Sequence, residues 1–240
     1  MNILINSELS VYDDLKRICP KDVTIKKKIV MKIEKISLEV DCHKDFIENT
    51  DNIIFQSKNA VKYSREIHGY ISKNKKANVY CMGKYTKREI GKYFTNDVFH
   101  PPKDYSSENL MRLLKDSKRN KQNYLIIKGL DGRNYVEKKI EDIALSSIVM
   151  NVYKRVPNTE CISDKDLDST KNNYFIVSSR TALKELIKNI TMHNSMILVI
   201  PNMRIVEEFA IEAFKDVIVI PNDSEAEQYI KIIGKHNEQV

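Results

Sequence analysis

The sequence predicts an α/β protein built from two related lobes, because the chain contains an internal repeat. The apolar segment at residues 53–61 returns loosely at residues 174–183, and in both copies an apolar run leads to a hydroxyl residue, a cation and a helix-like segment. Two further pairs of segments keep the same order: 78–83 with 196–201, and 97–108 with 216–225. A period of about 120 residues is the size of a domain and is too long for a solenoid repeat.

Short apolar runs alternate with longer amphipathic segments, which is typical of parallel sheets covered by helices. Seven runs are predicted to be strands: residues 3–5, 53–56, 79–82, 124–128, 175–177, 197–200 and 217–220. Three segments place apolar residues at helical spacing and are predicted to be helices: residues 60–73, 107–117 and 180–190.

Two segments interrupt this alternation and bracket the first copy of the repeat. Residues 32–40 alternate apolar and polar side chains, and residues 147–156 also have the composition of an extended segment. They predict a discontinuous lobe that returns after an insertion. The expected limits are 1–34 with 156–240 for the discontinuous lobe, 40–149 for the inserted lobe, and 35–39 and 150–155 for two connecting strands.

Composition favours a globular protein with an anionic partner. The 240 residues include 40 Lys and Arg against 33 Asp and Glu, a net charge of +7. The cations are spread along the chain, so a nucleic-acid-binding protein, which would show a steep salt dependence, stays an alternative supported by charge alone. No aromatic-basic motif supports that alternative, so we expect no nucleic-acid partner. Four cysteines without a C-x-x-C pair, no basic leader and no membrane-length apolar run predict a cytoplasmic protein that does not enter a membrane.

Motifs for cofactors and metals are lacking. The sequence contains no G-x-G-x-x-G, P-loop or H-E-x-x-H, and its five histidines share no spacing. We therefore expect neither a cofactor nor a metal.

Four loops that follow predicted strands combine a small or hydroxyl residue with a cation. Ligands of parallel sheets bind at the carboxyl ends of strands, where helix N-termini offer backbone N–H groups to anions. Helix capping alone is the alternative for any single loop, but four such loops favour carboxylate or phosphate binding. The predicted binding residues are Ser57, Lys58 and Asn59; Gly83, Lys84 and Thr86; Gly129 and Arg133; and Ser178, Ser179 and Arg180.

These loops carry a resemblance to the uroporphyrinogen-III synthase family, and the resemblance covers nearly the whole chain in the expected order. The matching segments are Ile54–Val61 (strand-S-x-x-A-V), Gly83–Thr86 (G-x-x-T), Gly129–Arg133 (G-x-x-x-R), Val152–Arg155 (V-Y-x-x) and Phe175–Ser179. The resemblance implies two Rossmann-like or flavodoxin-like lobes with parallel sheets, joined by a two-stranded ladder.

The resemblance also implies an activity. The family is a cofactor-free lyase of haem biosynthesis that cyclises hydroxymethylbilane, a substrate with eight carboxylates, with inversion of ring D and loss of water. Tyr153, at the V-Y position, is the implied catalytic residue: a phenol that assists departure of the substrate hydroxyl. We expect such an enzyme to act as a monomer.

The sequence departs from the family pattern at two places. Pro201–Arg204 stands where the family has G-x-x-T, and Asn6–Glu8 stands where it often has Arg-Pro. Both fall in the discontinuous lobe. They leave one alternative open, an inactive or divergent two-lobed protein that binds an anionic small molecule.

Overall fold

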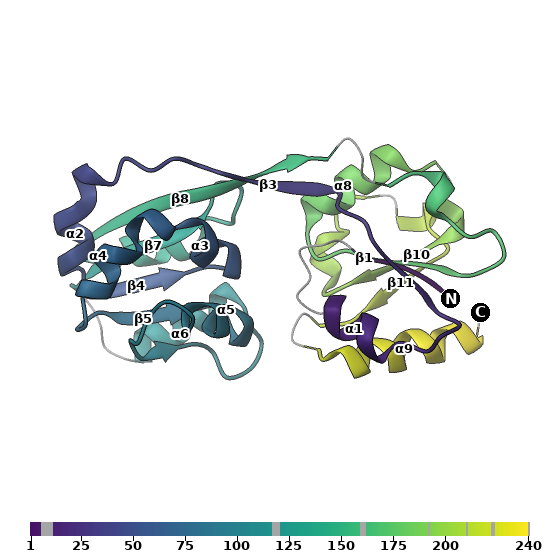
Figure 1. Cartoon of the computed structure of the whole chain (residues 1–240), viewed down its shortest axis with the longest axis horizontal. Helices are drawn as coiled ribbons and strands as arrows, with labels where there is room; N and C mark the ends of the chain where they lie inside the picture. Colours follow the sequence, from purple (N-terminus) through teal and green to yellow (C-terminus); the bar gives the residue numbers. More distant parts are fainter. Residues whose placement is uncertain are drawn as a thin grey trace. The chain divides into compact units, whose positions relative to one another are not determined.

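The computed structural model describes residues 1–5, 12–116, 121–158, 162–191, 193–209, 211–221 and 224–239. The chain divides into two compact units (Figure 1). Met1–Lys32 and Val156–Val240 form unit 1, and Ile33–Arg155 form unit 2. Each unit has its own sheet and its own apolar clusters on the two faces of that sheet.

Unit 1 contains a five-stranded sheet with the order β11-β10-β9-β1-β2, in which every pair is parallel. Its strands are β1 (Asn2–Ile5), β2 (Thr24–Lys27), β9 (Asn173–Ile176), β10 (Met196–Ile200) and β11 (Asp216–Val219). All residues of β1, β9 and β10 are buried because the sheet is covered on both faces.

One face of this sheet is covered by α1 (Tyr12–Ile18) and α9 (Ala226–Gln239), which contribute Leu15 and Ile233 to its cluster. The other face is covered by α8 (Arg180–Asn189), through Leu183 and Leu186. Four 3₁₀ turns complete the described elements: η3 (Asp164–Asp166), η4 (His193–Ser195), η5 (Met203–Ile205) and η6 (Ile211–Ala213).

Unit 2 is organised around a six-stranded sheet with the order β3-β8-β7-β4-β5-β6. Its strands are β3 (Met31–Lys35), β4 (Asn52–Phe55), β5 (Asn78–Cys81), β6 (Val98–Phe99), β7 (Asn123–Gly129) and β8 (Ser146–Pro157). Strands β4 to β8 pair in parallel. Strand β3 runs against β8, since backbone bonds join Asn158 N to Val30 O and Ile36 N to Val152 O.

Helices again cover both faces of the unit 2 sheet. One face carries α2 (Lys44–Asn49), α3 (Lys58–Tyr63), α4 (His68–Lys73) and α5 (Lys84–Ile90), together with η1 (Asp41–His43) and η2 (Arg65–Ile67). The other carries α6 (Ser107–Asp116) and α7 (Tyr135–Glu141).

The two sheets share one strand order, which is the structural form of the internal repeat. Strands β9, β10, β11, β1 and β2 occupy the same relative places as β4, β5, β6, β7 and β8. All seven predicted strands are present, and the prediction of two α/β lobes with largely parallel sheets is confirmed. In each sheet the connections diverge at one pair of neighbours, β4 and β7 or β9 and β1, and such a switch point is where open α/β sheets bind ligands.

The predicted single helix over residues 60–73 is wrong, because the helix breaks at Ser64. The Ser64 hydroxyl donates to Val61 O at 3.1 Å, and His68 Nε2 lies 3.0 Å from the same carbonyl. These side chains occupy the carbonyl that would accept the next helical N–H, so α3 ends and η2 and α4 follow.

The first connecting segment is shorter as a strand than the sequence predicts. Strand β3 ends at Lys35, and residues 36–40 are not in a strand. The alternation in this region instead reflects packing, since Leu38 and Val40 lie against the cluster beneath α3 and α4.

Candidate active site

Tyr153 lies near the end of β8 and is 3% exposed. Its hydroxyl is 3.1 Å from Ser57 Oγ, although the two residues are 96 positions apart. The ring also contacts Tyr63, with centroids 5.9 Å apart, and Arg155, whose guanidinium carbon is 5.6 Å from the centroid. The phenol is therefore fixed at both its ring and its oxygen.

A bulge next to Gly129 brings Tyr153 into this place. Lys128 pairs with Asn151, but Gly129 pairs with Tyr153, so β8 contains one extra residue. Leu130 N–H donates to Tyr153 O at 2.8 Å. A Cβ on Gly129 would lie 2.5 Å from Tyr153 Cζ and 2.9 Å from its hydroxyl. The ring thus occupies space that only a glycine leaves open.

Ser57 connects Tyr153 to the start of α3. It is the N-cap of that helix, and its Oγ accepts the Ala60 N–H at 3.0 Å. Ser57 follows β4, Gly129 ends the adjacent strand β7, and Tyr153 of β8 pairs with Gly129. They lie at the β4/β7 switch point, which is the expected ligand position in unit 2.

The other predicted residues of unit 2 also lie at the carboxyl ends of the strands. Lys58 and Asn59 are in the first turn of α3, and Gly83, Lys84 and Thr86 follow β5, the neighbour of β4. Gly83 lies against Tyr105, since a Cβ there would be 2.5 Å from its Cγ.

Two features limit what this edge offers a ligand. Arg133 Nη2 donates to Glu108 Oε1 at 3.0 Å, so part of its charge is already balanced. Burial raises the pKa of the Cys81 thiol, which donates to Gly83 O, to about 11, so this cysteine stays protonated and is a poor nucleophile.

In unit 1 the predicted loop follows β9. Ser179 is the N-cap of α8, and its Oγ accepts the Ala182 N–H at 3.3 Å. Arg180 donates to Glu208 at 2.6 Å and to Arg204 O at 2.8 Å, so this cation holds the segment after β10. Ser178 lies between the end of β9 and this cap.

Of the two segments that depart from the family pattern, the structure describes one. At Pro201–Arg204 the chain enters the 3₁₀ turn η5 from Asn202, and no side chain caps it. The other departure, Asn6–Glu8, lies outside the described residues.

The sequence analysis does not single out Lys128, Glu137 and Gln56, which form a hydrogen-bonded network beside the loop after β7. Lys128 Nζ donates to Gly132 O at 3.1 Å and forms an ion pair with Glu137. The available signal was a lysine directly after the buried run Tyr124–Ile127, because a buried charge needs a partner.

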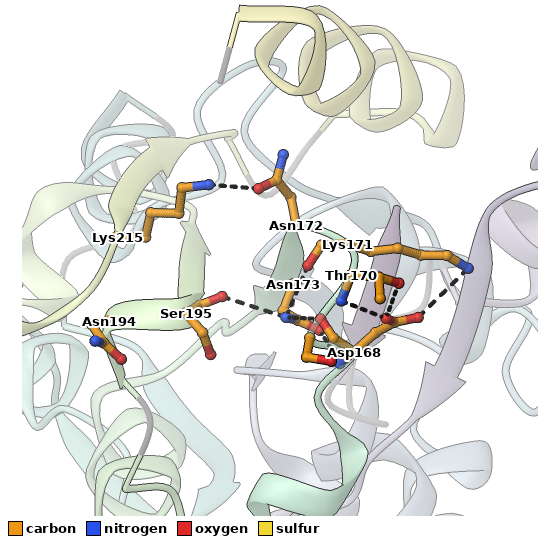
Figure 2. A pocket seen from close by; sticks show the side chains of 9 residues that line it. Asp168, Thr170, Lys171, Asn172, Asn173, Asn194, Ser195 and Lys215 are labelled. Carbon is orange, nitrogen blue, oxygen red and sulfur yellow. Dashed lines mark hydrogen bonds and ion pairs between the residues drawn. The ribbon is translucent and has the colours of Figure 1, made fainter.

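A polar pocket of about 380 Å³ in unit 1 lies at the amino ends of the strands, whereas ligands of parallel sheets bind at the carboxyl ends (Figure 2). It is lined by residues 168–173, Asn194, Ser195 and Lys215, which precede or begin β9, β10 and β11. Its loop is closed by its own bonds: Thr170 donates to Asp168, which lowers the pKa of that carboxyl, and Asn173 donates to Asp168 O.

Within the described ranges, no helix combines the length and apolar character needed to cross a membrane. In the same ranges, no three His, Cys, Asp or Glu side chains are grouped as a metal site.

Comparison with known proteins decides the family. The sequence profile described as "Uroporphyrinogen-III synthase HemD" matches residues 30–228. The chain belongs to the uroporphyrinogen-III synthase family. Family membership assigns it to tetrapyrrole biosynthesis. A sequence search of curated proteins finds no match.

Solved structures agree on the fold. A mutant uroporphyrinogen III synthase of the extremely thermophilic bacterium Thermus thermophilus superposes with a TM-score of 0.62 at 11% identity, and the match covers 100% of both chains. Uroporphyrinogen-III synthetase of Helicobacter pylori 26695 also gives 0.62, at 12% identity, with coverage of 97% of this chain and 98% of that one.

Proposed function

We propose that this chain is an active uroporphyrinogen-III synthase, a hydro-lyase that cyclises hydroxymethylbilane with inversion of ring D and loss of water. One observation carries the proposal beyond family membership: the Tyr153 hydroxyl lies 3.1 Å from Ser57 Oγ, beside the carboxyl ends of the neighbouring parallel strands β4 and β7. Ligands of such sheets bind at that edge.

Tyr153 is the proposed general acid for loss of the substrate hydroxyl. Its proton passes to the leaving oxygen, which departs as water, and the substrate becomes an azafulvenium cation, which gives the azafulvene when its pyrrole N–H proton is lost. Either oxygen of the Ser57–Tyr153 pair can donate. When Ser57 donates, the tyrosine proton is left for the substrate, and the same bond stabilises the phenolate that remains.

Positioning supplies the rest of the selectivity. Hydroxymethylbilane also closes without an enzyme, to the unrearranged isomer, so the protein must favour one path by a few kcal/mol. The proposed anion-binding residues Ser57, Lys58, Asn59, Gly83, Lys84, Thr86, Gly129 and Arg133 lie along one edge of unit 2 and suit a polycarboxylate. Ser178, Ser179 and Arg180 are the proposed contribution of unit 1.

The decisive experiment is incubation with freshly prepared hydroxymethylbilane, followed by separation of the type I and type III isomers. We expect type III in excess of the spontaneous background. If the chain gives only the background ratio while it still binds the bilane, it is an inactive binding protein and the proposal fails.

The Tyr153→Phe variant tests the assigned role. We expect the fold and KM to be kept, because the ring remains, and turnover to fall by about 10- to 100-fold, because the proton donor is lost. Circular dichroism and initial rates of type III formation measure both. Wild-type turnover would leave Tyr153 as a packing residue.

A further inference from the structure

A buried ion pair lies beside the loop that follows β7. Lys128 and Glu137 are bonded through Nζ and Oε1, and their side chains are 3% and 8% exposed. Removing two charges from water is costly, and such a pair is often no more stabilising than apolar residues of the same volume. Its presence therefore indicates a role other than stability alone.

The contacts of Lys128 show what the pair holds. Besides Glu137, Nζ donates to Gly132 O at 3.1 Å, Arg133 O at 3.2 Å and Asn134 Oδ1 at 2.8 Å. The loop after Gly129 thus curls around one ammonium group. This arrangement fixes the loop backbone through its carbonyls and leaves little freedom to the residue at its start, Gly129.

Glu137 extends the same network to the neighbouring strand. Its second oxygen accepts from Gln56 Nε2 at 3.3 Å. Gln56 directly precedes Ser57, which contacts the Tyr153 hydroxyl, and Lys128 directly precedes Gly129, which contacts the Tyr153 ring. The network is therefore one residue away from both groups that fix Tyr153.

We propose that Lys128, Glu137 and Gln56 are positioning residues, which lock the loops after β4 and β7 in register and so hold Tyr153 for its reaction. This inference rests on the proposed function of Tyr153. The network acts from the opposite face of the sheet: Glu137 is in α7, whereas Tyr153 packs in the cluster beneath α3 and α4.

The test uses the double variant Lys128→Met/Glu137→Leu, because either single change would leave one buried charge without its partner. The double change removes both charges at similar volume. The two carbonyls that lose their donor belong to Gly132, which is half-buried, and Arg133, which is exposed, so water can take the place of the ammonium group. The variant is therefore expected to fold, with a melting temperature within a few degrees of wild type.

In this folded variant we expect KM within about twofold of wild type and turnover lowered at least about tenfold, with a larger fraction of the type I isomer. Wild-type turnover and isomer ratio in a folded double variant would overturn the proposal and leave the pair as a structural element. Lys73→Met is the matched control, since Lys73 on α4 is 65% exposed where it pairs with Glu48, and its loss should leave both values unchanged.

Two readouts separate positioning from general damage. Adding the double change to Tyr153→Phe should cause no further loss of turnover, because the network acts only through the tyrosine hydroxyl that this variant already lacks; additive losses would count against the proposal. The NMR signals of the Tyr153 ring, assigned from Tyr153→Phe, should shift in the double variant. If the wild-type chain forms no type III isomer, the proposed function fails, and unchanged ring signals would separately overturn this inference.

Discussion

At the scale of single residues, the position of the Tyr153 ring depends on residue 129 being a glycine. Gly129 has no Cβ, and the tyrosine ring fills that space, with Cζ and Cε2 only 2.5 and 2.6 Å from where a Cβ would be. Tyr153 is part of the buried cluster of unit 2, so the ring cannot swing into solvent to make room. The glycine is thus a requirement of the phenol's position.

Gly129→Ala should therefore lower both stability and turnover. Overpacking of a filled core costs about 1–3 kcal/mol, and displacement of the ring breaks its hydroxyl contact with Ser57. Urea unfolding and the rate of type III formation measure the two effects. Gly234→Ala in α9 is the matched control: nothing lies within 4 Å of its added Cβ, so it should raise stability by about 0.5–1 kcal/mol, the helix-propensity gain, and leave turnover unchanged. A fully active Gly129→Ala enzyme would contradict this account of Tyr153.

At the scale of elements, the two copies of the repeat begin their first helices in the same way. Ser57 caps α3 and Ser179 caps α8, each by accepting the N–H three residues later. The copies differ in a second contact, because Ser57 also meets the Tyr153 hydroxyl. One serine therefore serves both its helix and the proposed catalytic group.

A comparison of Ser57→Ala with Ser179→Ala separates these two roles. Loss of an N-cap costs about 1 kcal/mol, so Ser179→Ala should lose about this much stability in urea, and Ser57→Ala should lose more, because the buried Tyr153 hydroxyl also loses its partner. Ser57→Ala should in addition lower turnover more than a loss of folded protein explains, since Tyr153 loses its partner. If the rate per folded Ser57→Ala molecule equals that of wild type, Ser57 is a helix cap and nothing more.

At the scale of the whole molecule, the two sheets share one strand order but take their strands from the chain differently. In unit 2 the five parallel strands follow one another along the chain, whereas in unit 1 β1 and β2 come from the N-terminus and β9, β10 and β11 from the C-terminal part. Strand β1 pairs with β9, and the paired residues Asn2 and Asn173 are 171 positions apart in the sequence. Unit 1 therefore cannot form its sheet until the end of the chain is present.

Two fragments should show this dependence. We expect Ile33–Arg155 to fold alone, because it contains the whole of unit 2. The shorter 40–149 should be less stable, since Met150, Val152 and Tyr153 belong to its core. In the fragment Met1–Arg155, we expect residues 33–155 to fold as unit 2, while residues 1–32 exchange their amide hydrogens freely. Protected amides in β1 or β2 of that fragment would show that unit 1 forms without its C-terminal strands.

Sequence pattern alone predicts seven of the strands and their duplication, but not β2 or α9. Apolar runs of strand length and helical periodicity record which side chains are buried, and burial is a local property of a segment in a covered sheet. The repeat then fixed the two-lobed architecture, and the loops at the strand ends indicated the edge where Ser57, Gly129 and Tyr153 lie.

Which of these residues come into contact depends on the tertiary structure. The contact of Tyr153 with Ser57 depends on the order of β4, β7 and β8 and on one extra residue in β8. The sequence pattern of a parallel strand does not reveal where a bulge shifts its register. The break of the expected helix at Ser64 and the Lys128–Glu137–Gln56 network have the same origin. Each depends on side-chain hydrogen bonds whose formation is decided by geometry, and periodicity reports only burial.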